Sequence, residues 1–226
     1  MSAYLRITSL ALACALGVAA CATDEYGNRL PMGDTETGAL VGALGGAALG
    51  ALVADKHAKG ALIGAVGGGI AGALVGKYMD DQKRDFMKVL RPEMDAGAVT
   101  VQTLPDNRLL VSMTGATAFD VDSDRIKGGF YPTLDRIAGV VNRYGKTQIA
   151  IVGHTDNTGS LQHNMDLSRR RAEAVQSHLL GQRVIPQRLG AAGVGPNEPR
   201  ASNATAEGRT LNRRVDLTII PIVAEG

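Results

Sequence analysis

Hydrophobic and polar positions follow a regular pattern over the second half of the chain. VTVQTL and RLLVSM predict two strands, which the turn residues Pro105, Asp106 and Asn107 join. TQIAIVG is a nearly continuous apolar run, which is typical of a buried strand, and RRVDLTIIPI predicts a closing strand. Arg188–Val194 predicts a further short extended piece, and a long polar loop, NEPRASNATAEGRTLN, follows it.

Two segments between these strands have the period of helices instead. The apolar positions of FYPTLDRIAGVVNRYG, which is predicted to end at Gly145, are Leu134, Ile137, Val140 and Val141. A second helix is predicted from Leu167 to Leu180, beginning near Asp166–Ser168, with either of these residues as its N-cap. Because strands alternate with helices, residues 98–226 are predicted to form an α/β domain, a small two-layer α/β sandwich.

Residues 37–76 have a different pattern, because they are almost entirely Gly, Ala, Leu, Val and Ile. Glycines recur at every fourth position in two runs, which the charged stretch Asp55–Lys59 separates. The runs are Gly38, Gly42, Gly46 and Gly50, and then Gly60, Gly64, Gly68, Gly72 and Gly76. On a helix this spacing puts the glycines on one face, along which another backbone can approach closely. The stretch predicts a glycine-zipper helical hairpin, embedded in a membrane or self-associating; a flexible low-complexity spacer is the alternative.

Residues 77–97 are predicted to connect this hairpin to the α/β domain. The stretch KYMDDQKRDFMKVLRPEMD places Tyr78, Met79 and Phe86 among charged residues, which indicates a moderately amphipathic helix. Pro92 is predicted to end it, because proline interrupts helix hydrogen bonding.

The N-terminal residues 1–20, MSAYLRITSLALACALGVAA, have the pattern of a secretory signal peptide. They contain one cation, Arg6, no acid, and an apolar run that is too short and wrongly flanked for a permanent membrane span. The small residues directly before Cys21 resemble the lipobox of bacterial lipoproteins, which implies cleavage there, a thioether-linked diacylglycerol on Cys21 and an acylated new N-terminus. The alternative is an ordinary signal peptide with an incidental cysteine, but a free thiol is a liability in an exported protein.

The residues after the predicted cleavage point bear on the location of the protein. Residues 21–36 are polar and predict a tether. Cys14 leaves with the signal peptide, so the mature chain has one thiol and no intramolecular disulfide. Ala22 follows the cysteine where an aspartate, by the rules of the lipoprotein family, implies retention at the inner membrane. We therefore expect a lipid anchor in the outer membrane, with the α/β domain in the periplasm.

The composition excludes one class of partner. The formal net charge is +2, aromatic residues make up 4%, and no basic tail is present. This is not the electrostatic footprint of a nucleic-acid-binding protein, so no nucleic acid is expected as a partner.

One stretch combines a strand end with opposite charges. In VGHTDNTGSLQHNMDLSRRRAEAV, Asp156 directly follows the buried strand and Arg171 lies in the predicted helix. Residues at strand ends commonly form sites, and a helix N-terminus favours a bound carboxylate. From the charges alone, a structural salt bridge without a ligand is as good an interpretation as a binding site.

The motifs in and after this stretch match a known family. GHTDNTGS at 153–160, Asn164, LSRRRA at 167–172 and NATAEGRTLNRRV at 203–215 resemble the signature of the OmpA-like C-terminal domain, which Gram-negative envelope proteins use to hold peptidoglycan. The resemblance covers roughly residues 98 to 222. With the lipobox and the glycine zipper, the whole chain resembles the YiaD-like glycine-zipper lipoproteins.

The resemblance implies a pocket for meso-diaminopimelate, an amino acid of the peptidoglycan stem peptide with an ammonium and a carboxylate on one stereocentre. The acid of the motif falls on Asp156 and its arginine on Arg171, whose planar fork suits a carboxylate. The other positions carried over to the same pocket are Thr155, Asn164, Leu167, Arg214 and Asp122. Arg169 and Arg170 are interpreted as a solvated face, and Arg213 as a strand-end charge.

We expect a non-enzymatic protein that tethers the outer membrane to the cell wall. His154, Asp156, His163 and Asp166 are close in sequence, but no HExxH, Cys/His set or G-x-S-x-G accompanies them, so neither a metal site, a cofactor nor catalysis is expected. An alternative is a self-assembling, chaperone-like membrane protein whose working part is the glycine zipper and whose wall binding only positions it.

Overall fold

The computed structural model of the protein describes residues 68–224. The predicted signal peptide (1–20), the lipidation site Cys21, the tether (21–36) and most of the glycine-zipper hairpin (37–76) lie outside the described residues. Among the described residues, no helix combines the length and the hydrophobicity that crossing a membrane requires.

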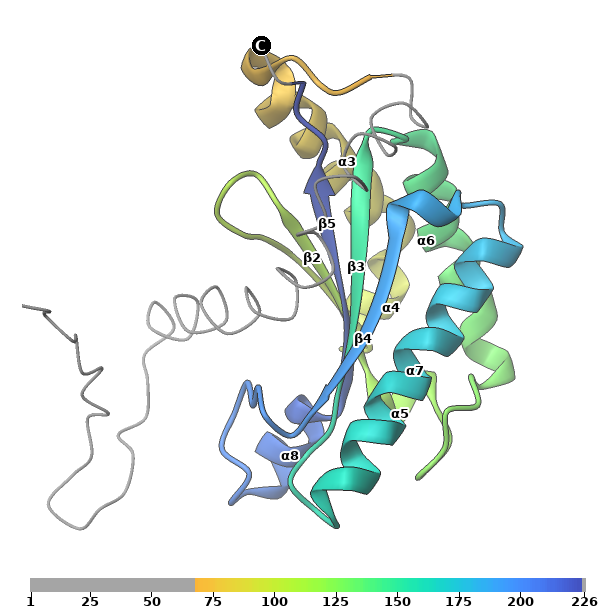
Figure 1. The fold of residues 1–226 in the computed structure, drawn as a ribbon, viewed down its shortest axis with the longest axis vertical. Helices are drawn as coiled ribbons and strands as arrows, with labels where there is room; N and C mark the ends of the chain where they lie inside the picture. The colour runs from red at the N-terminus through yellow and green to blue at the C-terminus, as the bar shows by residue number, and fades with distance from the viewer. Residues whose placement is uncertain (1–67, 225–226) are drawn as a thin grey trace, which may run out of the picture. The chain divides into compact units, whose positions relative to one another are not determined.

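A five-stranded sheet forms the centre of the described region, in the order β1-β2-β5-β3-β4 (Figure 1). The strands are β1 (Val99–Thr103), β2 (Leu109–Thr114), β3 (Thr147–His154), β4 (Leu189–Gly195) and β5 (Arg214–Pro221). β3 and β4 are parallel, and the other neighbours are antiparallel. β5 is the last strand in the sequence and lies at the centre of the sheet, between β2 and β3.

Helices pack on the sheet and connect its strands. They are α3 (Val75–Val89), α4 (Arg91–Asp95), α5 (Gly115–Ala118), α6 (Tyr131–Arg143), α7 (Leu161–Gly181) and α8 (Ala206–Asn212), with the short 3-10 turns η1 (Gly72–Leu74), η2 (Gly128–Phe130) and η3 (Pro186–Arg188). Figure 1 shows α6 and α7 side by side along one side of the sheet, and α8 beyond its lower end.

The hydrophobic core lies between one face of the sheet and the helices. Alternate strand residues point into it, for example Val111 on β2, Ile151 on β3 and Leu217 on β5, and all three are fully buried. Leu134 and Ile137 of α6 meet them, as the helical spacing predicts. The α/β sandwich prediction is therefore confirmed.

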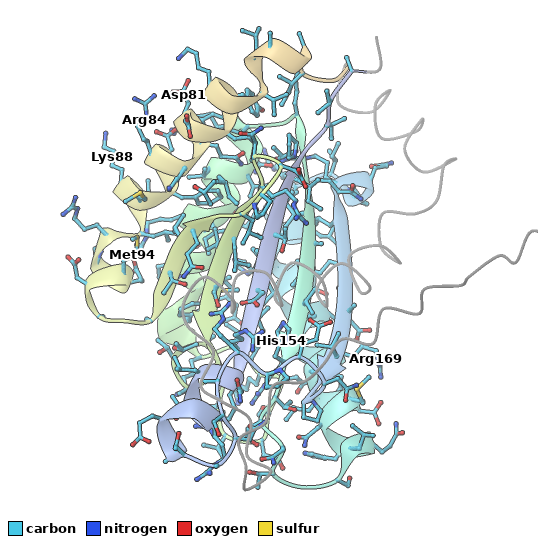
Figure 2. The ribbon with its side chains drawn as sticks, turned by 90° about the vertical axis from the view of Figure 1, so that its left-hand side faces the viewer. Asp81, Arg84, Lys88, Met94, His154 and Arg169 are labelled. Atoms are coloured by element: carbon cyan, nitrogen blue, oxygen red, sulfur yellow. The ribbon has the colours of Figure 1, made fainter. Side chains whose placement is uncertain are left out.

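Helix α3 belongs to this core as well. Its Met79 and Phe86, and Leu90 at its C-terminal end, are buried in the same apolar cluster as the strands. Asp81, Arg84 and Lys88 lie on the outward side of the helix (Figure 2). The domain boundary at residue 98 stays a prediction, but a fragment that starts there lacks part of the core.

Four local predictions differ from the structure. The second glycine run, predicted as a helix up to Gly76, is not helical where its description begins, because Gly68 adopts a φ of 94° and Ile70 forms a bridge with Val223 before η1. Helix α7 begins at Leu161, not near Asp166–Ser168, and its N-cap is Ser160, whose Oγ accepts from the backbone N–H of His163. The long polar loop before β5 contains helix α8. Pro92 does not end a long helix; α3 ends at Val89, and Pro92 lies in the first turn of α4, where a missing N–H costs nothing.

The described chain enters the domain at one end of the sheet. The backbone N–H of Ile70 donates to the carbonyl of Ile222 (2.7 Å), and the N–H of Ala224 donates to the carbonyl of Ile70 (2.9 Å), just beyond the C-terminal end of β5. Because β3 and β5 are antiparallel, His154 and Asp156 lie at the opposite end, beside the start of β5.

Candidate functional site

Helix α7 approaches the ends of β3 and β4 very closely, because glycines face it. A Cβ on Gly153 would overlap with the carbonyl oxygen of Ser168, and one on Gly193 with the backbone nitrogen of Arg169. Any side chain at these positions would push the helix outward. The glycines therefore fix the height at which α7 presents Arg171 above the sheet.

Asp156 lies in the turn after β3 with its carboxylate largely buried; its side chain is 9% exposed. Its Oδ1 accepts from the backbone N–H of Thr158 (2.9 Å), and its Oδ2 accepts from Nη1 of Arg213 (2.5 Å). Asn164 braces the same turn, because its Nδ2 donates to the carbonyl of Thr158 (2.9 Å). Burial raises the pKa of Asp156, but the hydrogen bonds from Arg213 and Thr158 outweigh it and hold the pKa below its usual value.

Arg171 is buried (5% exposed) and lies over the ring of Phe119, 5.1 Å from its centroid. Its Nε donates to the carbonyl of Ser123 (2.8 Å) and its Nη2 to the carbonyl of Asp120 (3.4 Å). Within residues 68–224, no carboxylate oxygen lies within 4.0 Å of its guanidinium. Arg171 is thus a buried cation whose acceptors are neutral carbonyls, which leaves it suited to an incoming anion.

The charges of the site influence one another. Burial lowers the pKa of Arg171 most; Asp122, Asp124 and Asp156 raise it, whereas Arg213 lowers it. An arginine remains protonated despite such a shift. Asp156, Arg171 and Arg213, which we call the site cluster, therefore lie close enough to act on each other electrostatically.

The loop of residues 119–127 supplies the acceptors of Arg171. It is closed by a bridge between Phe119 and Ile126, both of which are buried. At its tip Asp122 adopts a positive φ of 51°, and its Oδ1 lies 2.6 Å from Nε2 of His163 on α7. Asp122 is thus positioned on the rim of the site, with an exposed histidine as its partner.

Thr155 and Leu167 are both buried, at 4% and 5% exposure. The backbone N–H of Thr155 donates to the carbonyl of Gly195 (3.0 Å), which ties the turn after β3 to the end of β4. Its Oγ1 is buried and has no hydrogen-bond partner in the described part of the chain. Ligand contacts of Thr155 and Leu167 stay predictions.

Arg214 lies in a different group of charges. Its Nε donates to Oδ2 of Asp216 (3.0 Å), and its side chain is only 4% exposed. The same oxygen of Asp216 lies 3.3 Å from Nη2 of Arg200 and 3.4 Å from Nε2 of His154. Ser112 donates to the other oxygen of this carboxylate (2.5 Å). We call these residues the strand cluster: His154, Arg200, Arg214, Asp216 and Ser112. A direct ligand contact for Arg214 stays a prediction. Its guanidinium already donates to Asp216.

The strand cluster is charged in spite of its burial. Burial raises the pKa of Asp216, but Arg214 and His154 lower it far more, so the carboxyl stays ionised. Burial lowers the pKa of His154, and this outweighs the opposing effect of Asp216. Figure 2 shows His154 low on the sheet and Arg169 on the neighbouring helix.

Sequence reasoning missed Arg213, which it interpreted as a strand-end charge. The signal was present in NRRV, because consecutive residues entering a strand point to opposite faces. If Arg214 belongs to one face, Arg213 belongs to the other. The structure places Arg213 with Asp156 and Arg214 with Asp216.

The histidines and acids that suggest a metal site do not form one group. His154 pairs with Asp216, and His163 pairs with Asp122. Over residues 68–224, no three His, Cys, Asp or Glu side chains are arranged to hold a metal ion.

Comparisons with known proteins identify the class of the molecule. Residues 118–213 match the OmpA family, and residues 1–80 match the YMGG-like Gly-zipper family. The chain is also 40% identical over 210 residues, 92% of its length, to the probable lipoprotein YiaD of Escherichia coli, of which it covers 94%. The chain belongs to the OmpA family, with a Gly-zipper region and similarity to YiaD over most of its length, and this family is structural rather than enzymatic.

Two more distant relatives match less than half of the chain. The chain is 38% identical to outer membrane porin F of Pseudomonas aeruginosa over 45% of its length, which is 29% of that protein. It is 37% identical to the peptidoglycan-binding protein ArfA of Mycobacterium tuberculosis over 46% of its length, which is 32% of that protein. Among solved structures, the cell wall anchor of the T6SS from Pseudomonas aeruginosa superposes with a TM-score of 0.55 and 34% identity, covering 60% of this chain and 96% of that one.

Proposed function

We propose that this protein binds peptidoglycan without covalent linkage and recognises the diaminopimelate of the stem peptide. Asp156 would accept the ammonium of that residue, and Arg171 would bind its carboxylate. The observation that carries the proposal is the burial of Arg171 together with its hydrogen-bond partners. Arg171 is a buried guanidinium near a carboxylate that is not its partner, and among residues 68–224 it donates only to the carbonyls of Ser123 and Asp120.

The chemistry of the ligand fits these two groups. The distal centre of meso-diaminopimelate carries an ammonium and a carboxylate on the same carbon atom, so it needs an anion and a planar cation at short separation. A charge-assisted hydrogen bond to each is stronger than a neutral one. Lysine, which replaces diaminopimelate in some walls, lacks the second carboxylate and would leave Arg171 without its anion.

The relatives support wall binding independently of the geometry. One protein with 37% identity is named for peptidoglycan binding, and a structure with 34% identity is described as a cell wall anchor. The OmpA-family match over residues 118–213 contains Asp156, Arg171 and Arg213 of the proposed site.

We further propose that the protein joins the outer membrane to the wall. Lipid on Cys21 would fix one end, as the similarity to a probable lipoprotein supports. In the α/β domain, the chain enters beside Ile222 at one end of the sheet, and Asp156 lies at the other end. This arrangement suits a tether, because a membrane on the entry side leaves the site free to reach the wall.

A pull-down with isolated sacculi tests the proposal. The purified protein should sediment with diaminopimelate-type sacculi, and Asp156→Asn or Arg171→Gln should abolish sedimentation without unfolding the domain. Arg169→Gln is the matched control, because this exposed arginine pairs with Glu173 on the outer surface of α7. Sedimentation of both site variants at the level of the control would refute the assignment.

A second function rests on the N-terminal match to the YMGG-like Gly-zipper family. In that case the zipper would drive assembly at the membrane, and wall binding would only position it. Replacing Gly42, Gly46 and Gly64 with leucine distinguishes the two. Loss of assembly on cross-linking, with sacculus binding intact, would show that the zipper has a function of its own.

A further inference from the structure

Asp156 is already paired with a cationic side chain of the protein, Arg213. Nη1 of Arg213 lies 2.5 Å from Oδ2, so the carboxylate oxygen that a ligand ammonium needs is engaged by a guanidinium of the protein itself. The second oxygen is held by the N–H of Thr158. A ligand cation must therefore share Asp156 with Arg213 or displace it.

Arg213 is held so that its side chain can leave while its backbone stays. Its N–H donates to the carbonyl of Arg209 (3.1 Å), and its carbonyl accepts from Gly115 (2.7 Å). The side chain is 37% exposed, against 4% for Arg214, and its other contact is a hydrogen bond to the exposed hydroxyl of Thr210. Water can replace such contacts at little cost.

The two arginines of the site cluster repel each other when Arg213 is released. Arg213 already lowers the pKa of Arg171, so a charge interaction between them exists. A ligand that brings only an ammonium displaces Arg213 and leaves two guanidiniums without an added anion. A ligand that also brings a carboxylate supplies an anion beside Arg171 at the same moment.

We propose that Arg213 is an internal stand-in for the ligand ammonium, and that its displacement from Asp156 makes the site selective for head groups that carry both charges. This inference rests on the proposed function of the same site. Arg213 is then a specificity-determining residue that acts by competition. Selectivity of this kind comes from a penalty against the wrong ligand rather than from a stronger contact with the right one.

Calorimetric titration of the full-length protein tests this role with two probes: a stem tripeptide that ends in meso-diaminopimelate, and the same peptide ending in lysine. In Arg213→Gln, the lysine peptide should bind more tightly. The ratio of the two affinities should fall by about fivefold, which is the effect of losing one half-exposed charge contact. Arg213→Lys keeps the charge and should restore the ratio towards the wild-type value. Arg169→Gln should leave the ratio unchanged.

The outcomes separate the two proposals. If Arg213→Gln weakens both peptides equally, or weakens the lysine peptide more, Arg213 is a structural or ligand-contacting residue and the inference is wrong. That result leaves the proposed function standing, provided that Asp156→Asn still loses the diaminopimelate peptide. If the wild-type protein binds neither peptide, both proposals are wrong.

Discussion

The site cluster and the strand cluster lie at the same end of the sheet and both contain arginines and a buried aspartate, yet their charges are paired differently. In the strand cluster, Asp216 meets Arg214 and Arg200 and lies near His154. In the site cluster, Asp156 has only Arg213 as a charged partner, and Arg171 has no carboxylate within ion-pair distance in the described part of the chain.

This difference supports a structural role for the strand cluster and the proposed binding role for the site cluster. Burial of an ion is costly unless it is paired and hydrogen-bonded, and Asp216 and Arg214 satisfy each other fully in that sense. Arg171 is equally buried but relies on the carbonyls of loop 119–127. Its incomplete pairing makes it available to a carboxylate from outside. The geometry of the charged partners distinguishes the two clusters.

The largest expected effect is on stability, and it concerns Asp216. Asp216→Asn leaves the buried Arg214 without its carboxylate, and this should lower the free energy of unfolding by about 3 kcal/mol. Asp156→Asn breaks a pair whose arginine is more than one-third exposed, and it should cost about 1 kcal/mol or less. Urea unfolding of both variants measures the difference. Equal losses would contradict the distinction between the clusters.

The next effect is on ligand affinity, and here the site cluster should matter more than the strand cluster. Arg171→Gln should weaken the diaminopimelate peptide at least about tenfold, because one charge-assisted hydrogen-bonding group is lost. Arg214→Gln should destabilise the protein but change the affinity of the folded fraction by less than about threefold. Titration calorimetry below the unfolding temperature measures both. A larger loss in Arg214→Gln would restore Arg214 as a ligand contact.

A smaller effect concerns the pH dependence of stability. The pKa of His154 is lowered in the folded protein, chiefly by burial, so below about pH 6.5 the unfolded chain binds a proton that the folded protein does not. Stability should therefore fall as the pH drops below that value, by at most about 1.4 kcal/mol per pH unit. Asp156 and Asp216, whose pKa values are also lowered, lose their contribution only at lower pH, below their ordinary value of 3.8.

His154→Gln isolates this contribution. Its unfolding free energy should change less between pH 6.5 and 5 than that of the wild type, because the residue that takes up a proton on unfolding is gone. Denaturant unfolding at matched pH values gives both slopes. The same slope in both proteins would mean that His154 is not held neutral in the fold.

The smallest effect is expected at the exposed arginine of α7. Arg169 pairs with Glu173 (3.0 Å) and Asp166 (3.6 Å) in solvent. Arg169→Gln should leave unfolding and wall binding unchanged within error, because exposed ion pairs contribute little. A measurable loss of sacculus binding would extend the site along the outer surface of α7.

The fold could be predicted wherever an element has a clear apolar pattern. The strand TQIAIVG follows from its nearly continuous apolar run, and the helix with Leu134 and Ile137 follows from its periodicity; both are confirmed. The first turns of α7 were not predicted, because Gln162, His163 and Asn164 carry no apolar signal and only Ser160 marks the start. Helix α8 was not predicted either, since its seven residues are too few to show a stripe.

The site could be predicted only in part. Sequence motifs indicated Asp156 and Arg171, but local patterns do not say which charges meet across the fold. The pairing of Arg213 with Asp156 and of Arg214 with Asp216 depends on the register of β3 against β5, in which His154 lies opposite Arg214. Likewise, the amphipathic pattern of α3 predicts an apolar face, but it does not say that Phe86 packs into the core of the α/β domain.

The most direct test of the central claim is a crystal structure of the protein with the diaminopimelate stem tripeptide bound. We predict that the ligand ammonium lies within hydrogen-bond distance of Asp156, that its carboxylate lies on the guanidinium of Arg171, and that Arg213 has moved off Asp156. A bound peptide that contacts neither residue, with the Asp156–Arg213 pair intact beneath it, would contradict the account.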